Sequence, residues 1–299
     1  MERRQFIKNS LLATGALSFA QASAYASFNA GAKASPYKKS IMWGTVEAPG
    51  SVLEKCEAIR AAGYNGVEFN SHMNRKEALE ALKKTGLEAS SVCNSKHWEF
   101  HLAHPDAGVR QKGLDAMLVA MEDAKEYGTD AVLLVPGVVN NEISYKECWD
   151  RSTECIFKLI PIAEKLKVKI CIENVWNNFL LSPLEAANYI DQFNSKWIGF
   201  YFDAGNILAY GWPEQWINIL GKRMFRLHIK EFSLKLANSQ GKAAGFNAKL
   251  TEGDVNWTAV MNAVKNVGYE PWLTTEQGGG DSIEGLTDLS NRLDKILSL

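Results

Sequence analysis

Short apolar runs alternate with longer amphipathic segments along most of the chain. The runs are rich in β-branched and aromatic residues, which is typical of buried strands, and they lie at 41–46, 66–70, 87–94, 130–136, 168–172, 198–202, 225–232 and 271–276. The segments after them repeat apolar residues at helical spacing, and they lie at 51–63, 75–86, 109–128, 145–167, 182–193, 213–221, 257–268 and 281–299. A strand, a helix and a strand without room for a hairpin predict parallel pairing.

Eight such units fill residues 40–299 without a break in composition that would mark a second domain. This repeat predicts an α/β fold, a single (β/α)8 TIM barrel. The alternative is an open doubly wound sheet with fewer strands. No GxGxxG motif follows the first strand and no P-loop is present, so neither nucleotide-binding motif supports that alternative.

The N-terminus has the pattern of an export signal. Arg3 and Arg4 precede an apolar run at 11–20 and a stretch of small residues, which predicts a twin-arginine signal peptide over residues 1–26 and a linker over 27–39. The apolar run is shorter than the ~20 residues that span a bilayer. We therefore expect an exported, periplasmic protein with no stable membrane anchor after the signal is cleaved.

The amino-acid composition indicates which kinds of binding partner the protein is suited to. Hydrophobic residues make up 46% of the chain, and the net charge of −1 comes from interspersed acids and bases. This balance gives no support to a surface that binds nucleic acid, and we expect none. The chain has five cysteines and no CxxC pair, which favours ordinary buried thiols over a disulfide framework.

Four predicted strands in series present a metal-ligand type of side chain at their C-terminal ends. These residues are Glu173, Asp203, His228 and Glu276. The C-terminal ends of barrel strands meet at one rim, where α/β barrels carry their active sites. Three carboxylates and an imidazole would repel one another unless a cation lay between them. Oxygen-rich ligands with one imidazole favour Mn²⁺ or Mg²⁺, with Zn²⁺, Co²⁺ or Fe²⁺ as alternatives.

Such a site predicts chemistry at a carbon beside a sugar carbonyl. A divalent cation there acidifies the C–H and stabilises the enediolate that forms. Glu173 and Glu276, from strands five and eight, could remove and return the proton from opposite faces. Lys230 has the same strand parity as His228, so we expect it to point inward and to hold an oxyanion or hydroxyl.

The motifs GVEFN, IENVWNNFLLSP, GFYFDAGN, RLHIKEF, LTEGDVNW and LTTE occur in this order. Together they resemble the xylose-isomerase-like TIM-barrel superfamily, and within it the sugar phosphate isomerase/epimerase group with its ketose 3-epimerases and hydroxypyruvate isomerases. The resemblance covers about residues 40–299. It implies that Glu173, Asp203, His228 and Glu276 bind the metal and that the two glutamates double as the acid/base pair.

Three positions depart from the ketose epimerases of that family. A second glutamate, a histidine and an arginine are expected from the resemblance, and Phe179, Asn206 and Leu234 stand in their places. The metal platform therefore carries over, while the substrate contacts do not. Our candidate substrate contacts, each polar or aromatic and near a predicted strand end, are Glu68, His97, Trp98, Trp176, Asn206 and Lys230.

Three functions follow from these observations. The first is a metal-dependent isomerase or epimerase whose small-molecule substrate is a non-phosphorylated sugar or keto-sugar derivative. The second is a lyase, dehydratase or keto-glycoside-cleaving enzyme on the same metal platform. The third is a non-catalytic sugar-binding protein, which the presence of Glu173 and Glu276 disfavours. A homo-oligomer is compatible with each of them.

Overall fold

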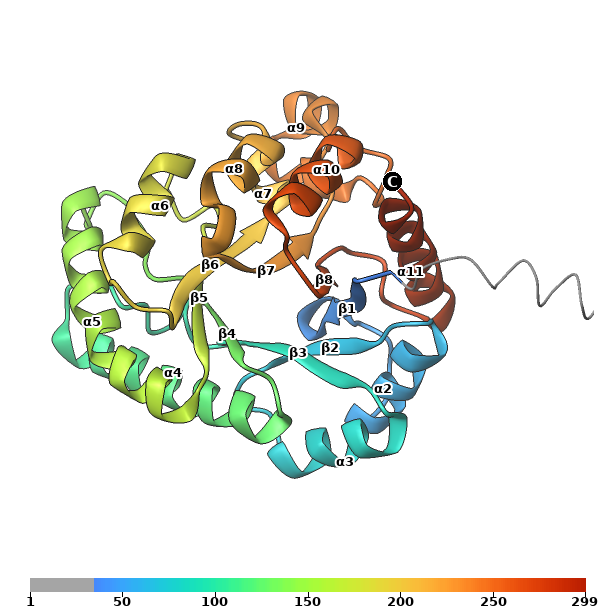
Figure 1. Ribbon diagram of the computed structural model, residues 1–299, viewed down its shortest axis with the longest axis horizontal. Helices are drawn as coiled ribbons and strands as arrows, with labels where there is room; N and C mark the ends of the chain where they lie inside the picture. Colours follow the sequence, from blue (N-terminus) through green and yellow to red (C-terminus); the bar gives the residue numbers. More distant parts are fainter. Residues whose placement is uncertain (1–34) are drawn as a thin grey trace, which may run out of the picture. The chain divides into compact units, whose positions relative to one another are not determined.

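Eight parallel strands pair in sequence order and close into a barrel in the computed structural model, which describes residues 35–299. The barrel closes where β1 pairs with β8, with Ser40 opposite Thr274. Figure 1 shows the helices around the strands of this unit. The predicted barrel is confirmed, and the open sheet is excluded. The strands are β1 (Lys38–Met42), β2 (Gly66–Asn70), β3 (Glu88–Cys93), β4 (Ala131–Leu134), β5 (Lys169–Ile172), β6 (Ile198–Asp203), β7 (Met224–Ile229) and β8 (Trp272–Thr275).

The predicted export signal over residues 1–26 lies outside the described residues, as does most of the predicted linker. β1 begins at Lys38, inside the linker range of 27–39. Within residues 35–299, no helix is both long enough and apolar enough to span a membrane.

The longer helices begin and end at residues that satisfy their free backbone groups. Ser51 and Ser144 each form a capping box, and Ser182 caps a helix that begins at Pro183, as their side chains suit them to do. Several helices end at glycines with positive φ, namely Gly86, Gly128 and Gly268. These helices are α2 (Val52–Ala61), α3 (Arg75–Thr85), α4 (Ala107–Tyr127), α5 (Tyr145–Leu166), α6 (Pro183–Asp191), α8 (Pro213–Leu220), α10 (Trp257–Val267) and α11 (Ile283–Leu297).

Five shorter helical segments were not predicted from the sequence. After β7, the polar, glycine-bearing stretch 233–256 contains α9 and η3. The side chain of Ser233 caps α9, and no residue of α9 is buried, so the apolar periodicity that would reveal a helix is missing. The short segments are η1 (Trp43–Thr45), α7 (Ala204–Leu208), η2 (Gly221–Arg223), α9 (Leu234–Gln240) and η3 (Lys242–Asn247).

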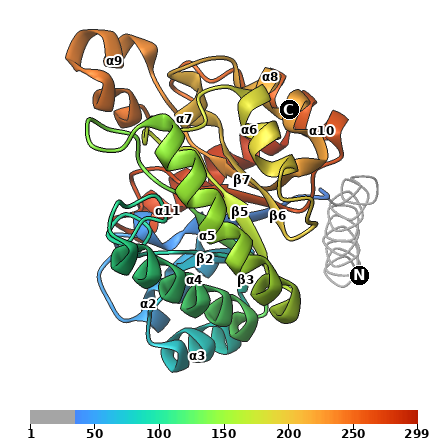
Figure 2. The ribbon, with the colours of Figure 1, turned by 90° about the vertical axis from the view of Figure 1, so that its left-hand side faces the viewer.

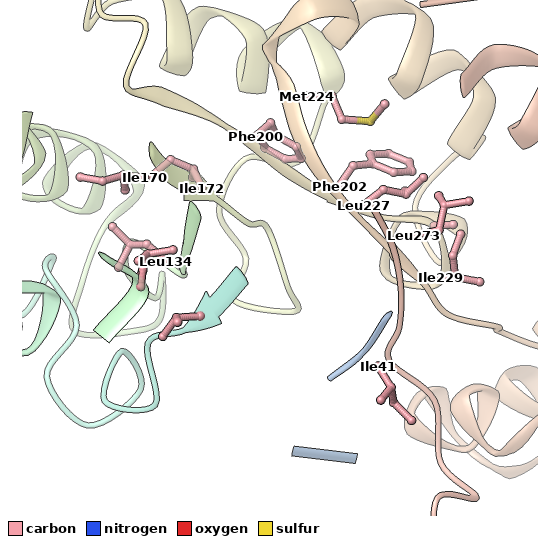
Figure 3. Packing of buried hydrophobic residues seen from close by; sticks show 14 of the residues in the cluster. Ile41, Leu134, Ile170, Ile172, Phe200, Phe202, Met224, Leu227, Ile229 and Leu273 are labelled. Atoms are coloured by element: carbon pink, nitrogen blue, oxygen red, sulfur yellow. The ribbon is translucent and has the colours of Figure 1, made fainter. Parts of the chain in front are cut away.

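Side chains along each strand point alternately outward and inward, and this alternation separates two apolar layers. Outward residues such as Ile172, Phe202 and Leu227 join the large core between strands and helices, as Figure 3 shows. Inward residues such as Cys171 and Tyr201 form a small cluster inside the barrel. Successive side chains point to opposite faces of a strand, so residues two positions further along also point inward. All five cysteines are buried and unpaired, as predicted.

Candidate metal centre

The side chains of Glu173, Asp203, His228 and Glu276 converge at the C-terminal end of the barrel. One potential ligand atom from each lies within 4.8 Å of the others. Glu173 follows β5, Asp203 ends β6, His228 lies in β7 and Glu276 follows β8. The strand parity described above turns all four inward, which brings residues far apart in sequence to one point.

His228 faces the three carboxylates through one ring nitrogen. Its Nδ1 lies 2.8 Å from Glu276 Oε2, 3.4 Å from Glu173 Oε1 and 4.0 Å from Asp203 Oδ2. His228 and Asp203 have no exposed side-chain surface, and Glu173 is nearly as buried. The ring is therefore oriented so that Nδ1 is the nitrogen available to a shared cation.

Glu68 holds the other nitrogen of the same ring. Glu68 Oε1 lies 3.0 Å from His228 Nε2. The second oxygen of Glu68 accepts hydrogen bonds from Ser91 Oγ and from Tyr201 OH. We expected Glu68 to contact substrate, but its side chain is fully buried behind the imidazole. This position suits a residue that fixes the tautomer of a ligand histidine.

Burial and charge act against each other in this cluster. Burial raises the pKa of Glu173 and raises that of Asp203 well above its usual range. Burial lowers the pKa of His228, but Tyr201, Glu68 and Glu276 outweigh it, and the pKa lies well above its usual value. So many ionisable groups at one buried point are typical of functional sites.

The residues fit a divalent cation. Asp203 Oδ1 accepts a hydrogen bond from the backbone N–H of Asn206 at 2.7 Å. Asp203 Oδ2 is buried and has no hydrogen-bond partner in the described part of the chain, which is costly for a carboxylate oxygen unless a cation or donor meets it. Three carboxylates and one imidazole suit several divalent metals, so the donor set leaves the identity of the metal open.

Lys230 and Asn206 touch the candidate ligands directly. Lys230 Nζ lies 2.7 Å from Glu276 Oε1 and 3.7 Å from Asp203 Oδ2, so Lys230 points inward as its parity indicated. Burial alone would raise the pKa of Glu276, but Lys230 and His228 outweigh it and hold the pKa below its usual range. Asn206 Nδ2 lies 3.5 Å from Glu173 Oε1. Its Oδ1 is buried without a hydrogen-bond partner among residues 35–299.

The three aromatic candidates lie further from the ligands. His97 is buried, and its Nδ1 accepts a 3.4 Å hydrogen bond from the backbone N–H of Val135. Trp98 is half exposed and meets the His97 ring edge-on at 5.3 Å between centroids. Trp176 packs 4.7 Å from the ring of Phe246. Across the described residues, none of the three forms a hydrogen bond or ion pair with the four candidate ligands. Their substrate contacts stay predictions.

Two positions that depart from the ketose epimerases lie away from the ligands. Phe179 is fully buried and packs against Tyr145 and Tyr189. Leu234 begins α9 and is partly exposed. Neither substitution removes a ligand from the metal centre.

Another buried carboxylate, Glu231, fixes the chain beside the centre. Glu231 accepts hydrogen bonds from the backbone N–H groups of Phe232, Thr251 and Val255 and from Trp257 Nε1, at 2.9–3.1 Å. The EGDVNW stretch thus wraps around this carboxylate, and its Asn256 caps α10.

Gln277 reinforces the same attachment. Its Oε1 accepts from the backbone N–H of Glu231 at 2.7 Å, and its Nε2 donates to the carbonyl oxygens of Phe246 and Ala248 at 3.0 and 2.9 Å. Sequence reasoning missed Glu231, Gln277 and Phe246, because their partners come from an irregular segment. Tyr201 was within reach, since it precedes Asp203 by two positions and shares its inward parity.

Comparisons with known proteins agree with this fold. A family model described as the xylose isomerase-like TIM barrel matches residues 56–294. L-ribulose-5-phosphate 3-epimerase UlaE of Escherichia coli strain K12 is 25% identical over 245 residues, covering 75% of this chain and 84% of the relative.

Solved structures resemble the barrel over most of its length. The apo form of 3-keto-D-glucoside 4-epimerase YcjR from E. coli has a TM-score of 0.74 at 14% identity, covering 88% of this chain and 100% of that chain. D-psicose 3-epimerase of Clostridium cellulolyticum H10, solved with D-tagatose, has a TM-score of 0.72 at 16% identity, covering 87% and 98%. At these identities the likeness shows the fold.

Proposed function

Because the chain belongs to the xylose isomerase-like TIM barrel family, we propose that it is a metal-dependent sugar isomerase or epimerase. The observation that carries this proposal is the convergence of Glu173, Asp203, His228 and Glu276 within 4.8 Å of one another. Relatives and structural neighbours that are epimerases by name support it.

The four residues would hold a divalent cation, with Glu68 orienting His228 from behind. When bound, such a cation supplies Lewis acidity that polarises a sugar carbonyl and lowers the pKa of the adjacent C–H. Mn²⁺ or Mg²⁺ suits the oxygen-rich donor set best, with Zn²⁺, Co²⁺ or Fe²⁺ as alternatives.

Glu173 and Glu276 act as the acid/base pair that transfers the substrate proton. They reach the centre from different strands, with Asp203 and His228 between them in chain order, and each has a carboxylate oxygen near His228 Nδ1. One removes the proton from the carbon beside the carbonyl and the other returns a proton to the enediolate. Lys230, 2.7 Å from Glu276, places a positive charge where negative charge develops on the substrate.

The proposed substrate is not phosphorylated. Two observations support this. The ammonium of Lys230 is already paired with Glu276 and Asp203, and no cluster of basic residues in the sequence marks a phosphate site. The export signal proposed for residues 1–26 would also place the protein in the periplasm, away from the cytosolic pool of sugar phosphates.

Proton exchange tests the proposed function. The purified protein, loaded with Mn²⁺ or Mg²⁺, is incubated in D₂O with free ketoses, aldoses, sugar phosphates and keto-glycosides, and the quenched, chelated samples are analysed by NMR. We expect deuterium at one carbon of a substrate, lost with chelator and at least about 100-fold slower in Glu276→Gln. Glu154→Gln, an exposed glutamate on α5, is the matched control and keeps full exchange.

The outcomes separate the three functions. Exchange that yields an epimer or isomer supports the proposal. Exchange followed by loss of a substituent at the neighbouring carbon would identify a lyase. Metal and sugar binding without exchange in any member of the panel would contradict catalysis and favour a binding protein.

A further inference from the structure

The segment Leu234–Asn247, which contains α9 and η3, reaches the metal centre through Phe246. Gln277, the residue after the candidate ligand Glu276, donates hydrogen bonds to the carbonyl oxygens of Phe246 and Ala248. In Figure 2, α9 stands out from the other helices. The outer part of the segment thus extends away from the barrel, while its C-terminal end is fixed beside Glu276.

Phe246 and Trp176 form an aromatic strip that begins at the metal centre. Lys230 Nζ, which pairs with Glu276, lies 4.7 Å from the centroid of the Phe246 ring. The Phe246 ring in turn lies 4.7 Å from that of Trp176, with 37° between the ring planes. Phe232 packs edge-on against both rings and is 1% exposed. It therefore supports the strip from behind.

Lys242 closes the outer end of the strip. Its Nζ lies 4.5 Å from the ring of Trp176 and 3.9 Å from that of Tyr210, and it donates a 2.6 Å hydrogen bond to Tyr210 OH. The contacts join three loops, those that follow β5, β6 and β7. The positive charges at both ends of the strip are thus engaged by protein groups, Lys230 by Glu276 and Lys242 by Tyr210.

The exposed surface of the strip suits a sugar ring. Phe246 and Trp176 are only half-buried, and aromatic faces pack well against the C–H faces of apolar rings. The Nε1 of Trp176 is buried and has no acceptor within residues 35–299, although a buried indole N–H usually finds one.

We propose that Phe246 and Trp176 form a second sugar-binding subsite, and that the substrate is therefore a glycoside or disaccharide. The reacting sugar occupies the metal centre and the second ring lies on the aromatic strip. This inference rests on the proposed function for the reacting sugar, but the subsite itself is testable by binding.

The test compares substrates matched at one position. Fructose, fructose 6-phosphate and the disaccharide isomaltulose differ in what O6 carries, and a methyl keto-glucoside and a keto-disaccharide form a second matched pair. Exchange in D₂O gives kcat/KM for each. Saturation-transfer NMR on the metal-loaded protein reports contact with the second ring, independently of turnover.

In whichever of the two substrate series undergoes exchange, we expect kcat/KM to be at least ten-fold higher for the disaccharide than for the substrate with one ring. We also expect saturation transfer to the second ring of that disaccharide. Phe246→Ala and Trp176→Leu should each lower the ratio of two-ring to one-ring kcat/KM at least five-fold and weaken that transfer. Phe157→Ala, which removes an exposed phenyl ring on α5, is the matched control and keeps the ratio.

A ratio near one together with no saturation of the second ring would overturn the subsite. A preference for the phosphate that is lost in Lys242→Gln would also overturn it, in favour of an anion site. Saturation of the second ring without exchange on any substrate would retain the subsite and reject the proposed function.

Discussion

At the scale of single residues, the orientation of His228 depends on a side chain that does not face the metal centre. Glu68 contacts Nε2, and Ser91 and Tyr201 in turn hold Glu68. A histidine whose second nitrogen is held by a carboxylate is a better-positioned and more basic metal ligand.

Glu68→Gln tests this arrangement. The amide keeps the size of the side chain but loses the negative charge beside Nε2, so we expect metal affinity to fall about 10- to 100-fold. Isothermal titration with Mn²⁺ measures the change. Glu88→Gln, an exposed glutamate paired with Lys38, should leave affinity intact. Unchanged affinity in a folded Glu68→Gln protein would contradict the role.

His97 gives the folded protein a sensitivity to acid. Burial lowers its pKa from 6.5 to about 4, with Glu276 opposing the shift. In the unfolded chain the imidazole keeps its ordinary pKa of about 6.5. Between these values the unfolded chain binds the proton and the folded chain does not. The free energy of unfolding therefore falls as pH decreases from about 6.5 towards 4, by up to about 1.4 kcal/mol per pH unit.

Urea unfolding at pH 7.5 and pH 5.0 measures this effect. The loss of stability between the two conditions should be about 2 kcal/mol smaller in His97→Asn than in the unmodified protein. His104→Asn serves as a control on another histidine. If His97→Asn lost as much stability on acidification as the parent, the buried neutral imidazole would not be the cause.

At the scale of elements, strand parity made the metal centre predictable from the sequence. The segment after β7, which contains α9 and η3, was not predictable in this way. Residues two apart on a strand share a face, so Asp203 and His228 could be placed inward from sequence. Burial of the strands also gave continuous apolar runs, which located β5 to β8 closely. The helices α9 and η3 lacked such a signal, and Phe246 could not be placed without knowing that its backbone carbonyl accepts a hydrogen bond from Gln277 Nε2.

The attachment of the 248–257 segment to Glu231 is a prediction at this scale. Glu231→Gln replaces an acceptor of four hydrogen bonds by a group with one acceptor oxygen, so buried donors lose partners. We expect the free energy of unfolding to fall by about 2 kcal/mol or more, and amides in this segment to exchange faster with solvent.

Hydrogen exchange read by mass spectrometry resolves the segment from the rest of the barrel. The control is Glu252→Gln, which alters an exposed glutamate of the same segment that pairs with Arg292. Equal exchange in both variants would show that Glu231 does not hold the segment.

At the scale of the whole molecule, the metal centre joins the second half of the barrel. Its four candidate ligands come from β5 to β8, and Glu68 adds β2. The four ligands come together only in the folded chain, so a cation binds the folded chain and not the unfolded one. Binding therefore stabilises the closed barrel.

Chelation should therefore lower the thermal stability. At a free metal concentration of 100 times Kd, a single site contributes about 2.7 kcal/mol, so adding chelator should decrease Tm by several degrees. Differential scanning calorimetry with and without Mn²⁺ measures the shift. Asp203→Asn should show a much smaller metal-dependent shift, whereas Asp191→Asn, on the surface at the end of α6, should keep it. A Tm independent of metal in the parent protein would contradict the site.

The attachment of Leu234–Asn247 has a consequence for how such proteins diversify. The candidate ligands lie at the ends of the strands, whereas Phe246, one of the two rings of the aromatic strip, lies on a connecting segment that Gln277 holds. A lineage could exchange this segment and acquire a new range of substrates while the metal centre stayed unchanged. Evolution, or a protein engineer, would then need to exchange the segment together with Gln277, which holds its C-terminal end, and could leave the eight strands unchanged.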